Sequence, residues 1–113
     1  MNNQQISSNQ VNLQEGTIEF WVKENKLIWN DGRANVLFNI SKGDGSLFMV
    51  KDSDNRLKLF HVILGKGRTD VEVDVAELSI NKSHYIVATW STEKKEVALY
   101  VDGELKAKSE IQY

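Results

Sequence analysis

Residues 97–108, which read VALYVDGELKAK, give the most direct indication of the fold. Two short runs with apolar residues flank the pair Asp102-Gly103. An Asp-Gly pair between such runs is a strong signal for a β-hairpin, because both residues tolerate the positive φ that a tight turn requires. The stretch therefore predicts two antiparallel strands, over residues 97–101 and 105–107.

Alternation of apolar and polar residues also occurs upstream of this hairpin. Around residues 17–23, one face carries Ile18, Phe20 and Val22, and the other carries Thr17, Glu19, Trp21 and Lys23. Further runs occupy residues 36–40, 47–50, 57–64, 71–75 and 85–90, and turn-forming clusters of Gly, Asn and Asp separate nearly all of them. Only residues 75–80 fit a helical turn. The pattern predicts an all-β fold, an antiparallel two-sheet β-sandwich.

Length and composition indicate one soluble globular domain. The chain has 113 residues, 41% hydrophobic and 27% charged, with a net charge of -2 that offers no broad electrostatic surface for nucleic acid or an anionic membrane. Cysteine is absent, which excludes disulfides, Cys-zinc sites and thiol nucleophiles.

The start of the chain is polar. The opening MNNQQISSNQ lacks the basic and apolar regions of a signal peptide, and no run approaches the roughly 20 apolar residues of a membrane span. We expect a flexible N-terminal segment over residues 1–14, a folded domain over residues 15–113, no nucleic-acid partner and no membrane insertion.

Several stretches resemble a known family when they are taken in order. They are EGTIEFWVK, IWNDGRANVLFNI, SLFMVKDSDNRLKLF, HYIVATW and EVALYVDGEL. Together they resemble the laminin-G-like branch of the concanavalin A-like lectin/glucanase superfamily, from about residue 15 to residue 108. The strand ending in ATW and the strand reading LYVDG are the most specific part of the resemblance.

The resemblance implies a jelly-roll of two antiparallel sheets in an extracellular, cell-surface or virion protein that binds glycans, proteins or calcium. Members of the family are usually longer, with further strands after the LYVDG hairpin. We therefore expect an incomplete sandwich with an open edge, and an open edge strand favours a homo-oligomer or a fragment of a longer protein.

The segment EVDVAE, residues 72–77, resembles the carboxylate triad of a laminarinase-type β-glucanase. In a regular strand Glu72 and Asp74 share a face, whereas Glu77 points the other way unless a bulge intervenes. Five strand steps span about 16 Å, but a retaining glycosidase holds its carboxyl groups roughly 5 Å apart. The segment is interpreted as a solvated strand face followed by a connector, and we expect no enzyme activity.

Calcium is the cofactor that the resemblance raises, and the oxygen ligands available in loops are Asp31, Asp44, Asp52, Asp54 and Asn55. The best group is Asp52, Asp54 and Asn55. A plain hairpin turn is the alternative, because Asp and Asn are common turn residues.

A carbohydrate site would need an exposed aromatic plane flanked by amides and carboxylates. Trp29 is the first candidate, with Asn30, Asp31 and Arg33 beside it in a loop, and Trp21 and Tyr100 are further candidates on strand faces. The alternative for each aromatic ring is packing in or against the sandwich.

Three other residues are assigned to the interior. Trp90 is expected in the core, and His61 and His84 are interpreted as structural because no third zinc ligand follows at a suitable spacing.

These observations favour a non-catalytic binding module for a glycan or a surface partner, either by itself or as part of a larger protein. The alternative is a structural or assembly domain of a surface array, fibre or virion, and a β-glucanase is a third reading.

Overall fold

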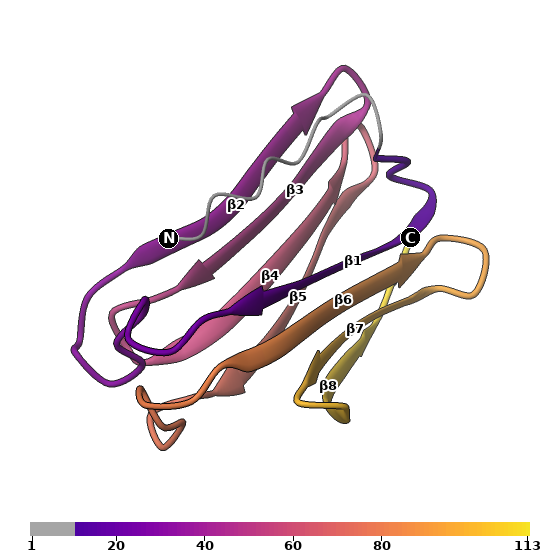
Figure 1. Cartoon of the computed structure of the whole chain (residues 1–113). Helices are drawn as coiled ribbons and strands as arrows, with labels where there is room; N and C mark the ends of the chain where they lie inside the picture. The colour runs from indigo at the N-terminus through magenta and orange to yellow at the C-terminus, as the bar shows by residue number, and fades with distance from the viewer. Residues whose placement is uncertain (1–10) are drawn as a thin grey trace.

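The computed structural model describes residues 11–113, which form two antiparallel four-stranded sheets packed as two layers (Figure 1). Sheet A has the strand order β1-β6-β7-β8, and sheet B has the order β2-β3-β4-β5. The strands are β1 (Glu15–Val22), β2 (Asn35–Lys42), β3 (Gly45–Lys51), β4 (Arg56–Ile63), β5 (Gly67–Asp74), β6 (His84–Ser91), β7 (Glu96–Val101) and β8 (Glu104–Glu110). The predicted all-β sandwich is confirmed.

The hairpin between β7 and β8 forms as its sequence predicts. Asp102 and Gly103 have φ values of 53° and 85°, and Val101 pairs with Glu104 across the turn. Further along this ladder the register shifts between Leu99 and Tyr100, which is a β-bulge in the edge pair. Bulges of this kind increase the local twist of a sheet edge.

The core lies between the sheets and follows the alternation of the sequence. Ile18, Phe20 and Val22 of β1 are buried, and Leu99 of β7 is fully buried. The rings of Phe20 and Phe38 meet edge to face across the two sheets, with centroids 6.1 Å apart. Burial of a side chain of this size contributes about 1.5–3 kcal/mol to folding, so the inward faces of both sheets supply the main stabilisation.

The folded domain begins earlier in the chain than predicted. Val11 and Leu13 are buried in the core. The carbonyl oxygen of Asn12 accepts a hydrogen bond from Trp90 Nε1 at 2.8 Å, and that of Leu13 accepts one from His61 Nε2 at 2.8 Å. Residues 11–14 therefore belong to the sandwich, whereas the predicted flexibility of residues 1–10 lies outside the described residues.

The sheet edges differ in how they are covered. The β5 and β8 edges lie close together, and Ser109 Oγ donates a hydrogen bond to the Asp70 carbonyl oxygen at 2.6 Å. Within residues 11–113, β1 and β2 each have a hydrogen-bonded neighbour on one side only.

The part of the chain that the structure describes contains no helix long and apolar enough to cross a membrane.

Candidate functional site

Trp29, the first aromatic candidate, lies in the core rather than on the surface. Its side chain is 2% exposed, and its ring meets the His84 ring edge to face with centroids 5.5 Å apart. The loop between β1 and β2 turns this indole inward, so it has no open face for a sugar. The expectation of an exposed ring at this position is corrected.

The neighbours of Trp29 in the same loop mainly hold the loop in place. Lys51, fully buried at the end of β3, donates from Nζ to Asp31 Oδ1 at 2.5 Å and to the Arg33 carbonyl oxygen at 2.6 Å. The hydrogen bond from Lys51 lowers the pKa of Asp31. Asn30 is exposed beside them. Asp31 and the Arg33 carbonyl group thus compensate the buried charge of Lys51. This structural role accounts for their position without a bound ligand.

The turn between β3 and β4, which was the calcium candidate, has protein partners for its oxygen atoms. Lys58 Nζ lies 3.2 Å from Asp52 Oδ2 and 2.9 Å from Asp54 Oδ2, and Asn55 Oδ1 accepts a hydrogen bond from the Gly32 N–H at 2.8 Å. Across residues 11–113, no group of three or more His, Cys, Asp or Glu side chains is arranged to hold a metal ion. The oxygen atoms of the turn thus pair with Lys58 and with the Gly32 N–H, as in the alternative of a polar hairpin turn.

The EVDVAE segment lies on a regular strand and a following turn. The ladder between β4 and β5 continues without a bulge to Asp74, and Glu72 forms an exposed ion pair with Arg56 at 3.4 Å. Glu77 comes after the strand, in the connection to β6. The bulge that a carboxylate triad would need is not formed.

Both histidines are buried and hydrogen-bond to backbone carbonyl groups. His61 Nε2 donates to Leu13, and burial lowers the pKa of His61. His84 Nε2 donates to the Ser79 carbonyl oxygen at 2.7 Å, and its Nδ1 lies 2.7 Å from Asp102 Oδ2. These contacts link strands to turns inside the fold.

The outward face of sheet A carries exposed aromatic residues. Trp21 is 55% exposed, and its cross-strand partner Tyr85 lies beside it with ring centroids 5.0 Å apart and an interplanar angle of 38°. Tyr100 is half-buried on β7, between Val87 of β6 and Leu105 of β8 in the ladders. We call Trp21, Tyr85 and Tyr100 the aromatic platform.

Tyr85 is a member of this platform that the sequence analysis did not select. A hydrogen bond to the Glu19 carboxylate raises the pKa of Tyr85. The signal that could have identified Tyr85 is the pairing of β1 with β6, because the register places it opposite Trp21 on the same face.

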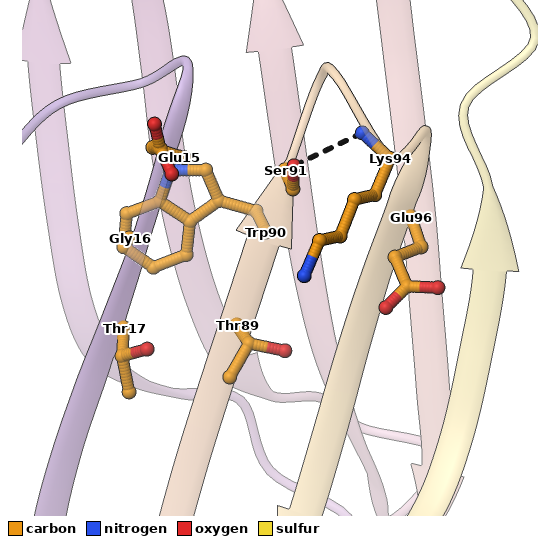
Figure 2. A pocket seen from close by; sticks show the side chains of 8 residues that line it. All are labelled: Glu15, Gly16, Thr17, Thr89, Trp90, Ser91, Lys94 and Glu96. Carbon is orange, nitrogen blue, oxygen red and sulfur yellow. Dashed lines mark hydrogen bonds between the residues drawn. The ribbon is translucent and has the colours of Figure 1, made fainter.

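A shallow hollow of about 290 Å³ occupies the other end of the same sheet face (Figure 2). It is lined by Glu15, Gly16, Thr17, Thr89, Trp90, Ser91, Lys94 and Glu96, and we call it the polar hollow. Thr17 and Thr89 are cross-strand partners, so their side chains stand side by side on β1 and β6. The hollow combines hydroxyl, carboxylate and ammonium groups on one open surface.

Gly16 is required where the hollow meets the core. A Cβ atom at this position would lie 2.7 Å from the Trp90 ring. The Trp90 ring also donates a hydrogen bond from Nε1 to the Asn12 carbonyl oxygen. Figure 2 shows the Trp90 ring lying across the strand at Gly16. Because Gly16 and Trp90 both line the hollow, the shape of the hollow depends on how they pack against each other.

The outward face of sheet B also has aromatic side chains, but these are paired with one another. Phe48 and Phe60 stack with centroids 5.8 Å apart, and the Arg68 guanidinium lies 5.1 Å from the Phe60 ring centroid. Arg68 also forms an ion pair with Asp70 at 2.8 Å. The aromatic surface of this face is used within the protein.

Comparison with known proteins places the fold in a family. The sequence model of the concanavalin A-like lectin/glucanases superfamily matches residues 1–113. No curated protein sequence matches the chain significantly.

Two solved structures are similar in fold. The Ruminococcus gnavus IT-sialidase CBM40 bound to alpha2,3 sialyllactose superposes with a TM-score of 0.64 at 18% identity, covering 88% of this chain and 55% of that chain. The R. gnavus IT-sialidase CBM40 superposes with a TM-score of 0.64 at 19% identity, covering 89% of this chain and 55% of that chain. At this identity the likeness shows the fold alone, and the chain spans about 55% of the length of these structures.

Proposed function

The chain belongs to the concanavalin A-like lectin/glucanases superfamily, and from this premise we propose that it is a non-catalytic carbohydrate-binding module. The observation that carries the proposal is the outward face of sheet A, which joins the aromatic platform to the polar hollow. The structurally similar sialidase module is bound to sialyllactose in its own structure, which supports a glycan as the ligand class.

The chemistry of this face matches the two surfaces of a sugar ring. The exposed indole of Trp21 offers an apolar plane for the C–H face of a pyranose, and aromatic rings are common anchors in such sites. The hydroxyl groups of Thr17 and Thr89 and the carboxylates of Glu15 and Glu96 offer donors and acceptors for sugar hydroxyls. An open face with these groups favours binding of a glycan at the surface of the module.

The exposure of the same groups supports binding without catalysis. Glu15 is exposed, and the Glu96 side chain is 43% exposed. Glycosidases hold a pair of carboxyl groups around the scissile bond, and partial enclosure raises the pKa of the general acid so that it stays protonated. A shallow hollow on an open sheet does not provide this enclosure.

A glycan array with matched variants tests the proposal. We expect the protein to bind a set of glycans and Trp21→Ala to weaken that binding at least about tenfold, because central aromatic anchors contribute strongly to affinity. The control is Phe60→Ala on the outward face of sheet B, which should bind like the unmodified protein.

Two results would contradict the proposal. One is the absence of binding to any glycan on the array. The other is release of sugar from a bound glycan, which would indicate an enzyme.

The open strand edges favour a second candidate, a role in assembly through copies of the chain. Within residues 11–113, β1 and β2 pair on one side only, and Val36 on β2 is 51% exposed. Unpaired edges of this kind can extend a sheet into a neighbouring molecule. Light scattering over a range of concentrations tests this role: a mass that rises to a defined oligomer supports it, and a constant monomer mass excludes it.

A further inference from the structure

The aromatic platform and the polar hollow lie along the same two strands. Thr17 and Trp21 are four residues apart on β1, and Thr89 and Tyr85 are four residues apart on β6. Four strand steps cover about 13 Å. Because even-numbered steps return to the same face of a sheet, both sites present their side chains to the same side. One ligand can reach both sites only if it is extended.

The surface between the two sites is continuous with them. Glu19 and Val87 are cross-strand partners midway along this path. A ligand that follows β1 and β6 would therefore meet hydroxyl groups, then Val87 and the Glu19 carboxylate, and then the aromatic rings.

The charges on this face disfavour an acidic ligand. The carboxylates are those of Glu15, Glu19, Glu96 and Glu110, and the cations are Lys94, Lys108 and Lys23, which is exposed just beyond the end of β1. Lys108 lies 3.8 Å from Glu96 and is partly neutralised by it. A ligand carboxylate placed here would meet more like charges than opposite charges.

Arginine is absent from the outward face of sheet A. The three arginines of the chain are Arg33, before β2, Arg56 on β4 and Arg68 on β5, so all of them belong to sheet B and its loops. Arginine is the side chain best suited to bind a carboxylate through two parallel hydrogen bonds. The face therefore lacks the group that an acidic sugar would require most.

We infer that the ligand of this face is an extended, uncharged oligosaccharide that contacts the polar hollow and the aromatic platform together, and not an acidic sugar. The inference rests on the proposed function and specifies its ligand class. The inferred ligand differs in charge from alpha2,3 sialyllactose, which is bound in the structure of the sialidase module with the same fold.

Calorimetric titration of the whole chain tests the inference. The probes are ladders of neutral gluco-, manno- and xylo-oligosaccharides from monosaccharide to hexasaccharide, together with lactose and alpha2,3 sialyllactose. We expect affinity for at least one ladder to rise about tenfold or more between the monosaccharide and a length that spans both sites. We expect sialyllactose to bind no more tightly than lactose.

Two variants assign the length dependence to the two sites. Trp21→Ala should remove the gain from chain length while the melting temperature stays the same, and Phe60→Ala should preserve the gain. If Trp21→Ala fails to fold, Tyr100→Ala replaces it, because Tyr100 lies on the same platform.

The outcomes separate this inference from the proposed function. Tighter binding of sialyllactose than of lactose supports a carbohydrate-binding module but overturns the uncharged ligand. Affinity that does not change with length overturns the extended ligand. Binding to neither class of probe overturns the inference, and a glycan array that is also negative overturns the proposed function with it.

Discussion

The outward faces of the two sheets have similar aromatic content but use it differently. On sheet B, Phe48 stacks on Phe60, and Arg68 covers Phe60 while pairing with Asp70. On sheet A, Trp21 lies beside Tyr85 and still exposes more than half of its surface. The face of sheet B is completed by contacts within the protein, whereas the face of sheet A presents an apolar plane to the solvent.

The comparison indicates that the aromatic surface left exposed to solvent, and not the composition alone, distinguishes the two faces. Exposed aromatic surface beside polar groups is the usual character of a ligand site. A ring covered by a neighbouring cation has already made its favourable contacts.

The largest expected effect is a difference in stability between two substitutions on opposite faces of β7. Leu99→Ala removes a fully buried side chain from the core and should lower the free energy of unfolding by about 2–5 kcal/mol. Tyr100→Ala, on the outward side of β7, should cost less than about 1 kcal/mol. Urea denaturation measures both. Equal losses would mean that Tyr100 is a structural residue and not part of an exposed platform.

A smaller loss of stability should follow from a methyl group at Gly16. Gly16→Ala places a Cβ atom against the Trp90 ring and should cost about 1–3 kcal/mol by overpacking. Gly43→Ala is the matched control, because no atom lies within 4 Å of its Cβ position. Thermal melting compares the two variants, and equal melting temperatures would show that the Trp90 ring moves freely.

Loss of one hydroxyl group should weaken ligand binding without changing the fold. Thr89→Val keeps the shape of the side chain in the polar hollow, and loss of a neutral hydrogen bond costs about 0.5–1.5 kcal/mol, or about two- to twelvefold in affinity. Ser46→Ala, on the outward face of sheet B, removes a hydroxyl group outside the site. Titration with the array ligand checks the pair, and equal affinities would place the ligand elsewhere.

The smallest expected effect is a change in stability at acidic pH that involves only sheet B. Hydrogen bonds from the Ser53 N–H and from Lys58 lower the pKa of Asp52, and the hydrogen bond from Lys58 lowers the pKa of Asp54. Because the folded-state pKa values lie below the unfolded value of about 3.9, this stabilisation is present above that pH and is lost as the pH falls through the folded values.

Lys58→Met should therefore flatten the dependence of the melting temperature on pH below about pH 4, where these carboxyl groups titrate. Lys66→Met, in the turn between β4 and β5, serves as the control. The same slope in both variants would contradict the role of Lys58, and glycan binding should be unchanged in each.

The sequence predicts the fold well because its signals are local. Alternating residues and the Asp102-Gly103 turn specify strands and hairpins from neighbours in the chain. The prediction places the start of the domain at residue 15, but Leu13 is buried because its contacts, such as the one with His61, are made far along the chain.

The candidate site was predicted only in part, because the burial of a side chain and the register between strands depend on contacts between residues far apart in the sequence. The residues around Trp29 have the composition of a surface loop. The buried Lys51 of β3, however, holds that loop against the core. Tyr85 joins Trp21 only through the pairing of strands more than sixty residues apart. The exposure of Trp21 follows from alternation, so its outward position is predictable from the sequence.

Chemical-shift mapping of a bound array glycan, by heteronuclear NMR of the labelled chain, locates the binding face residue by residue. We predict that the perturbed amides cluster on β1 and β6, around Thr17, Trp21, Tyr85 and Thr89, while the amides around Phe48 and Phe60 stay unchanged. Perturbations centred on β3 and β4 would contradict the assignment of the binding face to sheet A.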